Sequence, residues 1–322
     1  MSMPKIWCLG IANMDVLIRY VRRWPERGGL VVVDTVDLQI GGVALNTAVS
    51  IAKLGGIHVG LIAHIGNDPF GRILRDNLQT IGVDTSHLVV SKTRPTGICI
   101  VCVHPDGERS FLYCFGANEE LHEQSAMIEE AVAGDYLHIG GALGMPQLNG
   151  QPLACLLQWA QEQGLTTSVD TTWDVTEQWW PSIAPALPYI DIFMTNELEA
   201  KHLTKYSNPQ QAAEYLASAG ARIIVVKQGA RGCYVYSDNW QGQVPAFNTQ
   251  VVDTTGAGDA FAGAFIYGLA RGWEIEQAAT FANAVGALCV AALGATSGVR
   301  SYSDTLDMIR GQGRAKSWSW RI

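Results

Sequence analysis

From about residue 136 onward, short apolar β-rich runs alternate with segments of helical periodicity, and this alternation constrains the fold more than any other feature. Strands that alternate with helices of this length predict βαβ units and a mainly parallel sheet. In such sheets, ligands bind beyond the carboxyl ends of the strands, so a functional site is expected there. The strands predicted in this part are 136–139, 166–170, 190–194, 223–227 and 233–236, and the helices are 152–163, 197–203 and 209–219.

The first half of the chain is richer in β structure. A turn at residues 104–107 contains Asp-Gly, which predicts a hairpin between the last two strands of this half. No repeat, low-complexity tract or linker divides the chain, so we predict a single α/β domain over residues 1–322. The strands expected in this half are 6–11, 30–40, 59–65, 97–103 and 110–114.

Charge and hydropathy exclude two classes of partner. The chain carries 22 Lys+Arg against 30 Asp+Glu, a net charge of −8, and has no basic cluster, whereas nucleic-acid surfaces need concentrated positive charge. One uncharged run, residues 277–299, is long enough to be tested as a membrane span. It contains Asn283 and breaks at a Gly-Ala-Thr-Ser-Gly segment, so we interpret it as a buried helix followed by a loop.

The cysteines and the N-terminus indicate the compartment. The seven cysteines are odd in number and scattered, which is typical of free thiols in a reducing cytoplasm. No secretory signal pattern opens the chain. Cys99 and Cys102 form a Cys-x-x-Cys inside the predicted strand 97–103, where residues three apart face opposite sides. We therefore interpret them as packing residues and expect no metal or redox site there.

The most specific motif is Asp-Thr-Thr-Gly-Ala-Gly-Asp at residues 253–259. Small and apolar residues at helical spacing follow, so Gly256, Ala257 and Gly258 are expected where a loop becomes a helix. Unpaired N–H groups and the dipole at a helix start form an anion site. Asp259 would repel a static phosphate, but it suits a base that deprotonates an attacking hydroxyl during phosphoryl transfer. The alternative is that Asp259 only caps the helix.

This run closely resembles the C-terminal signature of the ribokinase-like (pfkB) carbohydrate kinase family. It lacks the Gly-Lys-Ser/Thr of a Walker A loop, and it lies far from the first strand, where a Rossmann fingerprint would occur. Four motifs follow the family's order over residues 6–300. The resemblance implies a ribokinase-like three-layer α/β/α fold with a mainly parallel central sheet and a small β-sheet lid, formed by about residues 14–40 and 95–116.

The N-terminal motif is predicted to bind the substrate. Gly41 and Gly42, followed by Asn46, match the family's Gly-Gly…Asn signature. Paired glycines let a substrate approach the backbone, and an Asn amide both donates to and accepts from a hydroxyl. Asp15, after the first predicted strand, matches the family's substrate-binding aspartate. Taken alone, each segment also suits a plain turn.

Two further segments are predicted to serve the nucleotide. Asn196 and Glu199 match the family's Asn-x-x-Glu motif, to which the resemblance assigns Mg²⁺ and phosphate organised through water. Residues at i and i+3 share a helix face, and helix capping is the alternative. Lys227, with Gly229 and Gly232, resembles the nucleotide segment. Many relatives have Thr at the lysine position, so Lys227 either contacts phosphates or is solvated.

The remaining expectations also come from the resemblance. Asn283 and the loop 293–297 resemble the adenine-side wall, and a monovalent cation such as K⁺ is implied near Asp253. An apolar lid implies a homodimer that pairs through it. Arg109, at the hairpin turn, is expected at the surface, with contact to an anionic or polyol substrate as the alternative.

Together these features predict a cytoplasmic, ATP- and Mg²⁺-dependent kinase acting on a hydroxymethyl group of a small sugar or sugar derivative. A nucleoside kinase of the same family and an inactive sugar-binding protein are the alternatives. The substrate stays open, because residues 170–174 lack the Arg often found in fructokinase and keto-deoxygluconate kinase relatives. Val43 likewise stands where ribokinase-type sequences have Lys after the paired glycines.

Overall fold

A nine-stranded sheet forms the centre of the computed structural model, which describes residues 3–106, 108–315, 318 and 320. The strand order is β13-β12-β11-β10-β9-β8-β1-β4-β5, and all neighbours are parallel except β11–β12 and β12–β13. The predicted α/β class with a mainly parallel sheet is therefore confirmed. The strands are β1 Ile6–Gly10, β4 Val59–Gly66, β5 Leu88–Ser91, β8 Tyr136–Ala142, β9 Thr166–Thr171, β10 Ile192–Asn196, β11 Ile223–Lys227, β12 Cys233–Tyr236 and β13 Gln241–Val244.

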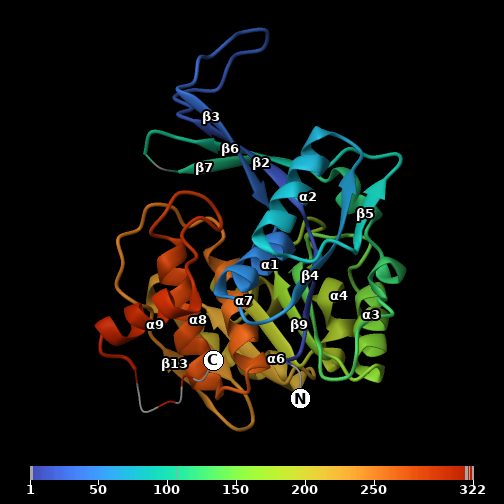
Figure 1. Cartoon of the computed structure of the whole chain (residues 1–322), viewed down its shortest axis with the longest axis vertical. Coiled ribbons are helices and arrows are strands. Elements are labelled where there is room, and N and C mark those ends of the chain that lie inside the picture. Colours follow the sequence, from blue (N-terminus) through green and yellow to red (C-terminus); the bar gives the residue numbers. More distant parts are fainter. Residues whose placement is uncertain (1–2, 107, 316–317, 319, 321–322) are drawn as a thin grey trace.

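Helices cover both faces of this sheet and make a three-layer structure (Figure 1). One face carries α1 Val43–Leu54, α2 Pro69–Ile81, α7 Ala257–Ala270, α8 Ile275–Cys289 and α9 Tyr302–Gly311, and the other carries α3 Gln151–Glu162, α4 Trp180–Ile183, α5 Glu197–Thr204 and α6 Pro209–Ser218. Short 3₁₀ turns lie at Gly116–Glu120, Glu123–Ala126, Ala184–Tyr189 and Gly229–Arg231.

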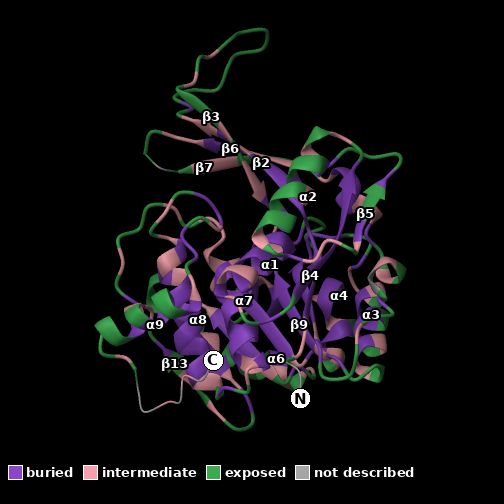
Figure 2. Cartoon of the chain, viewed as in Figure 1, coloured by how far each residue is buried: buried purple, intermediate pink, exposed green. Residues whose placement is uncertain are grey.

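Two hydrophobic cores follow from the alternation of side chains along the buried strands. In β10, Ile192 and Met194 belong to one core, whereas Phe193 between them belongs to the other. Figure 2 shows the buried strands enclosed between the helices, whose outer faces are exposed. The continuous apolar character of these strands is thus explained by burial on both faces.

A second, four-stranded sheet projects from the body (Figure 1). Its order is β3-β2-β6-β7; β2 and β6 are parallel, and the other two pairs are antiparallel. The predicted hairpin of residues 97–103 and 110–114 is confirmed as β6 and β7, although Gly107 of its turn lies outside the described residues. Its strands are β2 Asn13–Arg19, β3 Thr35–Gly41, β6 Gly97–Val103 and β7 Arg109–Cys114.

One expectation about the first half was wrong: of the predicted strand 30–40, only Thr35 onward is a strand. Asp15 follows β1 as expected and lies within β2, where it is paired with β3 and β6. The helix α2 and the strand β5 were not foreseen.

The expectations for the uncharged run and for the cysteines hold. The uncharged run at residues 277–299 forms the buried part of α8 and a loop after it. Among the described residues, no helix is long and apolar enough to cross a membrane. All seven cysteines are free thiols. Cys99 is paired across the sheet with Asp15 and Cys102 with Ile18, so the two thiols lie on opposite faces of β6 as predicted.

Candidate active site

The glycine motif lies where a loop turns into α7, as the sequence predicts. Gly256 is the residue before the helix, with a left-handed φ of 74°. A Cβ at this position would lie 2.2 Å from the carbonyl oxygen of Ala295, so only glycine fits. No side chain caps this helix start, because Asp259 lies within the first turn. The capping alternative for Asp259 is therefore not what the structure has. The Ala257 N–H donates to the Thr254 carbonyl oxygen at 3.4 Å, and the helix start offers its other first-turn N–H groups to an anion.

Asp259 is held by the N-terminal motif. The Asn46 amide donates a hydrogen bond from Nδ2 to Asp259 Oδ2 at 2.8 Å, while the buried Oδ1 of Asn46 has no partner within the described part of the chain. Burial raises the pKa of Asp259 to about 6, against the lowering effect of Asn46 and Lys227. A carboxylate with this pKa is well suited to accept a proton near neutral pH. The free oxygen of Asn46 is suited to a hydroxyl donor beside it.

Asp15 and Gly41 lie together at the root of the small sheet. A Cβ on Gly41 would lie 2.2 Å from Asp15 Oδ2, so the carboxylate occupies the space that this glycine leaves. Asn13 donates to Asp15 Oδ1 at 2.5 Å, and burial raises the pKa of Asp15 to about 7. Glycine is required at position 42 by the backbone itself, because its φ is 105° and a Cβ would lie 2.4 Å from the Ile11 carbonyl oxygen.

Lys227 is neither solvated nor free for phosphate in this structure. Its Nζ donates to both carboxylate oxygens of Asp170, at 2.6 and 2.7 Å. The same Nζ lies 3.3 Å from where a Cβ of Gly258 would be, so the ammonium group adjoins the start of α7. Burial opposes the charge on Lys227, but Asp170 outweighs it and raises the pKa of the lysine. Burial raises the pKa of Asp170 to about 7, with Lys227 opposing the shift.

Sequence reasoning missed Asp170 as the partner of Lys227. Asp170 is almost completely buried near the end of β9, and Lys227 ends β11. Strand β10 lies between them, so the ion pair spans the carboxyl edge of the sheet. The available signal was the rule that parallel strands place ligand-binding residues at this edge. Asp170 ends the predicted strand 166–170 and satisfies that rule.

Asn196 and Glu199 form a capping box at the start of α5. Asn196 Oδ1 accepts from the Glu199 N–H at 2.9 Å, and Glu199 Oε2 accepts from the Asn196 N–H at 3.4 Å. Thr171 also donates to Oε2 at 2.7 Å, so all the hydrogen bonds found for this carboxylate fall on one oxygen. No cluster of three acidic, His or Cys side chains within the described ranges could bind a metal directly. The donor set therefore fits Mg²⁺ held by water and phosphate, which keeps several waters in proteins.

Arg109 and Asp253 meet, contrary to the expectation of a surface arginine. Arg109 Nη1 donates to Asp253 Oδ1 at 2.9 Å. Asp253 Oδ1 also accepts from the Thr255 N–H at 2.9 Å, and Oδ2 accepts from the Gly294 N–H at 2.9 Å. Despite burial, these N–H donors and the guanidinium charge hold the pKa of Asp253 below its usual value. The Asp253 carboxylate thus already has a cationic partner in Arg109, and the monovalent-cation site implied near it stays a prediction.

Asn283, Gly229 and Gly232 are three of the residues that the resemblance assigns to the nucleotide. Asn283 is buried, and its amide donates to the Val244 carbonyl at 3.1 Å, which ties α8 to β13. Gly232 packs against the same carbonyl, where a Cβ would be only 2.0 Å from the oxygen. Gly229 lies exposed in a 3₁₀ turn with a φ of 56°. Asn283 therefore holds two elements of the fold together. Of these three residues, only Gly229 has free space beside it where a ligand could approach.

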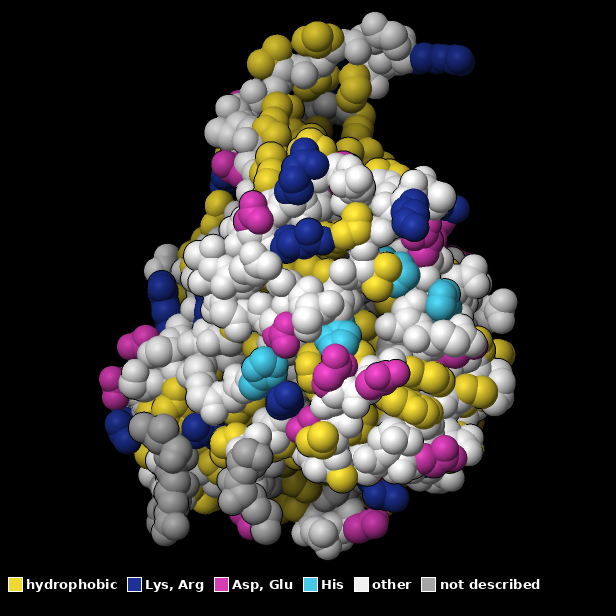
Figure 3. Space-filling model, turned by 45° about the vertical axis from the view of Figure 1, so that its right-hand side comes forward, with side chains coloured by type: hydrophobic (Ala, Val, Ile, Leu, Met, Phe, Trp, Pro, Cys, Tyr) yellow, Lys and Arg dark blue, Asp and Glu magenta, His cyan; other side chains and the backbone are white. Residues whose placement is uncertain are grey.

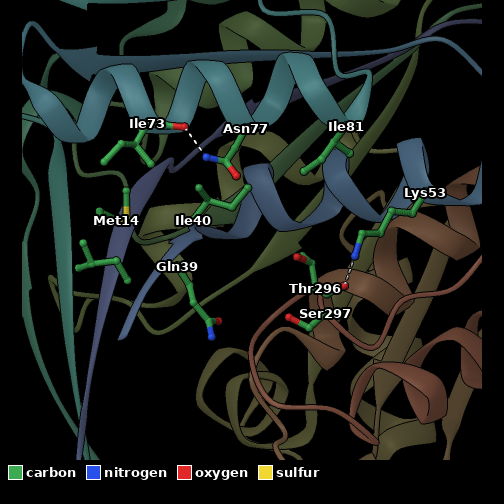
Figure 4. A pocket seen from close by; sticks show the side chains of 10 residues that line it. Met14, Gln39, Ile40, Lys53, Ile73, Asn77, Ile81, Thr296 and Ser297 are labelled. Atoms are coloured by element: carbon green, nitrogen blue, oxygen red, sulfur yellow. Dashed lines mark hydrogen bonds between the residues drawn. The ribbon is translucent and has the colours of Figure 1, made fainter. Parts of the chain in front are cut away.

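A cavity of about 290 Å³ lies between the small sheet and α2 (Figure 4). Asp259 is not among the residues that line it. Met14 and Ile40 line it from strands β2 and β3, and Lys53 borders it from α1. Met14 precedes Asp15 in β2, so the two side chains face opposite sides of the sheet. Lys53 Nζ donates to the Thr296 carbonyl at 2.7 Å, which closes one end of the cavity.

Comparisons with known proteins agree with this geometry. The family model described as "pfkB family carbohydrate kinase" matches residues 3–301. An ATP-dependent ribose-1-phosphate kinase of Halopiger xanaduensis is 30% identical over 296 residues, covering 92% of this chain and 95% of its own. The Arabidopsis thaliana ribokinase complexed with ribose and ATP has a TM-score of 0.81 at 24% identity, covering 96% and 99% of the two chains. A Vibrio cholerae fructokinase double mutant in the fructose-, ADP- and potassium-bound form has a TM-score of 0.80 at 25% identity, covering 95% and 98%.

Proposed function

Because the chain belongs to the pfkB family of carbohydrate kinases, we propose that it transfers the γ-phosphoryl group of ATP to a hydroxymethyl group of a small sugar or sugar derivative. The observation that carries this proposal is the Asn46–Asp259 hydrogen bond beside the uncapped start of α7. This hydrogen bond places the proposed substrate-binding amide, Asn46, next to the proposed base, Asp259, at the helix start that forms the anion site.

In the proposed reaction, Asp259 accepts the proton of the sugar hydroxyl as its oxygen attacks the γ-phosphorus. The new O–P bond forms while the bond between the γ-phosphorus and the bridging oxygen breaks, and ADP leaves with the electron pair. The N–H groups of Gly256, Ala257 and Gly258 stabilise the charge on the transferring group. Asp15 and Asn46 orient the sugar through its hydroxyls, with Gly41 and Gly42 leaving room for it.

ATP binding is assigned to the carboxyl edge of the sheet. Mg²⁺, when bound with ATP, neutralises charge on the β- and γ-phosphates. Glu199 would hold its waters through Oε1, with Asn196 beside it, because Oε2 already accepts the capping hydrogen bonds. Lys227 places a positive charge at the start of α7. Gly229 borders the nucleotide through its open side, whereas Gly232 shapes the adjoining turn by packing against the Val244 carbonyl. We assign no step to potassium, because Arg109 occupies Asp253.

A nucleoside substrate is the second candidate, and one observation favours it. The cross-strand row that contains Asp15 continues through Cys99 to Tyr113, which is 38% exposed. Phe111, two residues earlier on the same strand, is exposed on the same side of the sheet. Exposed aromatic rings beside a hydroxyl-binding carboxylate are suited to stack a base. A binding protein without catalysis is disfavoured, since Asp259 and the anion site are both intact.

A homodimer through the small sheet is part of the proposal. Leu38, Val16, Ile100 and Leu112 form a cross-strand row on the side opposite Asp15, and the two leucines at its ends are exposed. Hydrophobic side chains gather on this projecting part in Figure 3. Soluble monomers rarely leave such a face uncovered. Analytical ultracentrifugation of the wild type and of Leu112→Asp tests this, and a monomeric wild type would contradict it. We place the enzyme in the cytoplasm, where free thiols persist.

The deciding experiment measures ADP release in a coupled assay with ATP and Mg²⁺ against pentoses, hexoses, sugar phosphates, sugar acids and nucleosides. Turnover with a sugar or its derivative supports the proposal, and turnover confined to nucleosides supports the second candidate. Sugar binding in calorimetry without any turnover would establish a binding protein instead.

A further inference from the structure

Arg109 connects the small sheet to residues 253–255, the loop that precedes the anion site. It is the first residue of β7, and its guanidinium reaches a loop 144 residues later in the sequence. Nη1 donates to Asp253 Oδ1 at 2.9 Å and also to Thr255 Oγ1, and Nη2 donates to Thr254 Oγ1 at 2.6 Å. Three consecutive residues that lead directly into Gly256 are therefore bound by one side chain.

Asp253 links that contact to two loops. Its Oδ1 accepts from the backbone and hydroxyl of Thr255, at 2.9 and 2.7 Å. Its Oδ2 accepts from the Gly294 N–H, one residue before Ala295. The Ala295 carbonyl in turn lies where a Cβ of Gly256 would be. The carboxylate therefore fixes the two segments that together set the backbone of Gly256.

The other edge of the small sheet touches the same place. Strands β3 and β7 are the two edge strands. Gln39 of β3 packs against Gly294 so closely that a Cβ there would lie 2.1 Å from Gln39 Oε1. Gln39, Asp15 and Arg109 are all on one face of the sheet by strand register. The sheet face that carries Asp15 therefore also contacts the loops around the anion site. Arg109 on edge strand β7 contacts residues 253–255, and Gln39 on edge strand β3 contacts Gly294.

We propose that Arg109 is a positioning residue that couples the seating of the small sheet to the assembly of the anion site. When the sheet is seated, the guanidinium binds Asp253, Thr254 and Thr255 and aligns the N–H groups of residues 256–258. When it lifts, Asp253 loses its cationic partner and the loop loses this restraint. This inference rests on the proposed kinase function. It also implies that the enzyme supplies the cation at Asp253 itself.

The kinetic test compares Arg109→Ala and Arg109→Lys with the matched control Arg22→Ala. Arg22 lies between β2 and β3 and forms an exposed ion pair with Asp34 at 2.7 Å, away from the glycine motif. We expect Arg109→Ala to lower kcat by about 10²-fold, the scale for misplaced catalytic groups, with little change in the KM for sugar. Arg109→Lys should recover part of kcat, and Arg22→Ala should match the wild type. Equal kcat in Arg109→Ala and wild type would overturn the proposal.

Potassium gives a second, sharper readout. The wild type should show the same kcat in sodium and in potassium buffers, whereas potassium should raise kcat in Arg109→Ala because Asp253 is then vacant. A wild type that depends on potassium would overturn the inference, since the guanidinium would not be serving as the cation.

A third readout does not depend on turnover. In hydrogen exchange of the free full-length protein, Arg109→Ala should lose protection both in residues 97–114 and in residues 250–258. Loss in the hairpin alone would overturn the coupling. Because this measurement uses no substrate, coupled loss of protection in a protein that phosphorylates no sugar would refute the proposed function while supporting the coupling.

Discussion

Asn46 Nδ2 donates to Asp259 Oδ2 at 2.8 Å, although 213 residues of sequence separate the two side chains. The hydrogen bond joins the start of α1 to the start of α7. Both helices lie on the same face of the central sheet and pack against each other. The distance between the substrate-binding amide and the base is therefore set by helix packing, which makes it resistant to local motion of either loop.

Replacing the base should abolish most of the turnover. We expect Asp259→Asn to lower kcat by at least about 10²-fold, since a positioned general base typically contributes that much. Sugar affinity, measured by calorimetry, should change little, because Asn keeps the size of the side chain and a carbonyl oxygen for Asn46. Near-normal kcat in this variant would refute Asp259 as the base.

The pH profile of kcat should fall on the acid side near the pKa of Asp259, about 6, because only the carboxylate accepts a proton. Glu199 raises this pKa and Lys227 lowers it. Removing the negative charge in Glu199→Gln should therefore shift the acid limb to lower pH. Removing the positive charge in Lys227→Met should shift it to higher pH. Shifts of the same sign in both variants would contradict the electrostatic assignment.

Replacing only one residue of the Asp170–Lys227 ion pair should lower the free energy of unfolding substantially. Lys227 is mostly buried and Asp170 nearly completely so. Removing one partner leaves the other charge unpaired in the interior, a loss of about 3–5 kcal/mol. Urea unfolding should show this loss for Asp170→Leu, and a smaller one for the double variant Asp170→Leu/Lys227→Met. If the double variant loses as much as the sum of the two single variants, the pair does not couple in the folded protein.

Glu199 should affect magnesium more than the fold. Glu199→Gln keeps a carbonyl oxygen for the capping hydrogen bonds but removes the charge that would face magnesium-bound water. We expect its half-saturating Mg²⁺ concentration to rise about 10-fold or more, the scale for residues that act through the ligands of a metal. Thermal unfolding should stay close to that of the wild type. An unchanged Mg²⁺ dependence would leave Glu199 a capping residue only.

The sequence was most informative where a functional group is formed by the backbone of a short, continuous segment. Gly256 and Gly258, followed by small, helically spaced residues, predicted the loop-to-helix transition, and the structure has it at Gly256. The strand β2 escaped prediction because Asn13 and Asp15 are turn-forming residues, and pairing with both β3 and β6 overrides that preference. The turn that this segment alone also suits is therefore not formed at Asp15.

The partners of Lys227 and Arg109 were not predicted from the sequence. The Asp170–Lys227 pair requires that β9 and β11 lie on either side of β10, a fact of strand order that no local pattern contains. The Arg109–Asp253 pair requires that a hairpin fold back over a loop from the other end of the chain. Each partner is an ordinary charged residue in the sequence, and only the three-dimensional arrangement makes it functional.

Two natural cysteines are placed so that the distance between the small sheet and the body of the protein can be measured with attached dyes. Cys114 on β7 and Cys155 on α3 are the exposed cysteines, one on the projecting sheet and one on the body. The others are buried except Cys99, which is partly exposed, and burial raises the pKa of its thiol to about 12, so it reacts slowly with maleimide dyes. A donor and an acceptor dye can thus be attached to the unmutated chain, and single-molecule energy transfer between them would follow opening and closing in real time.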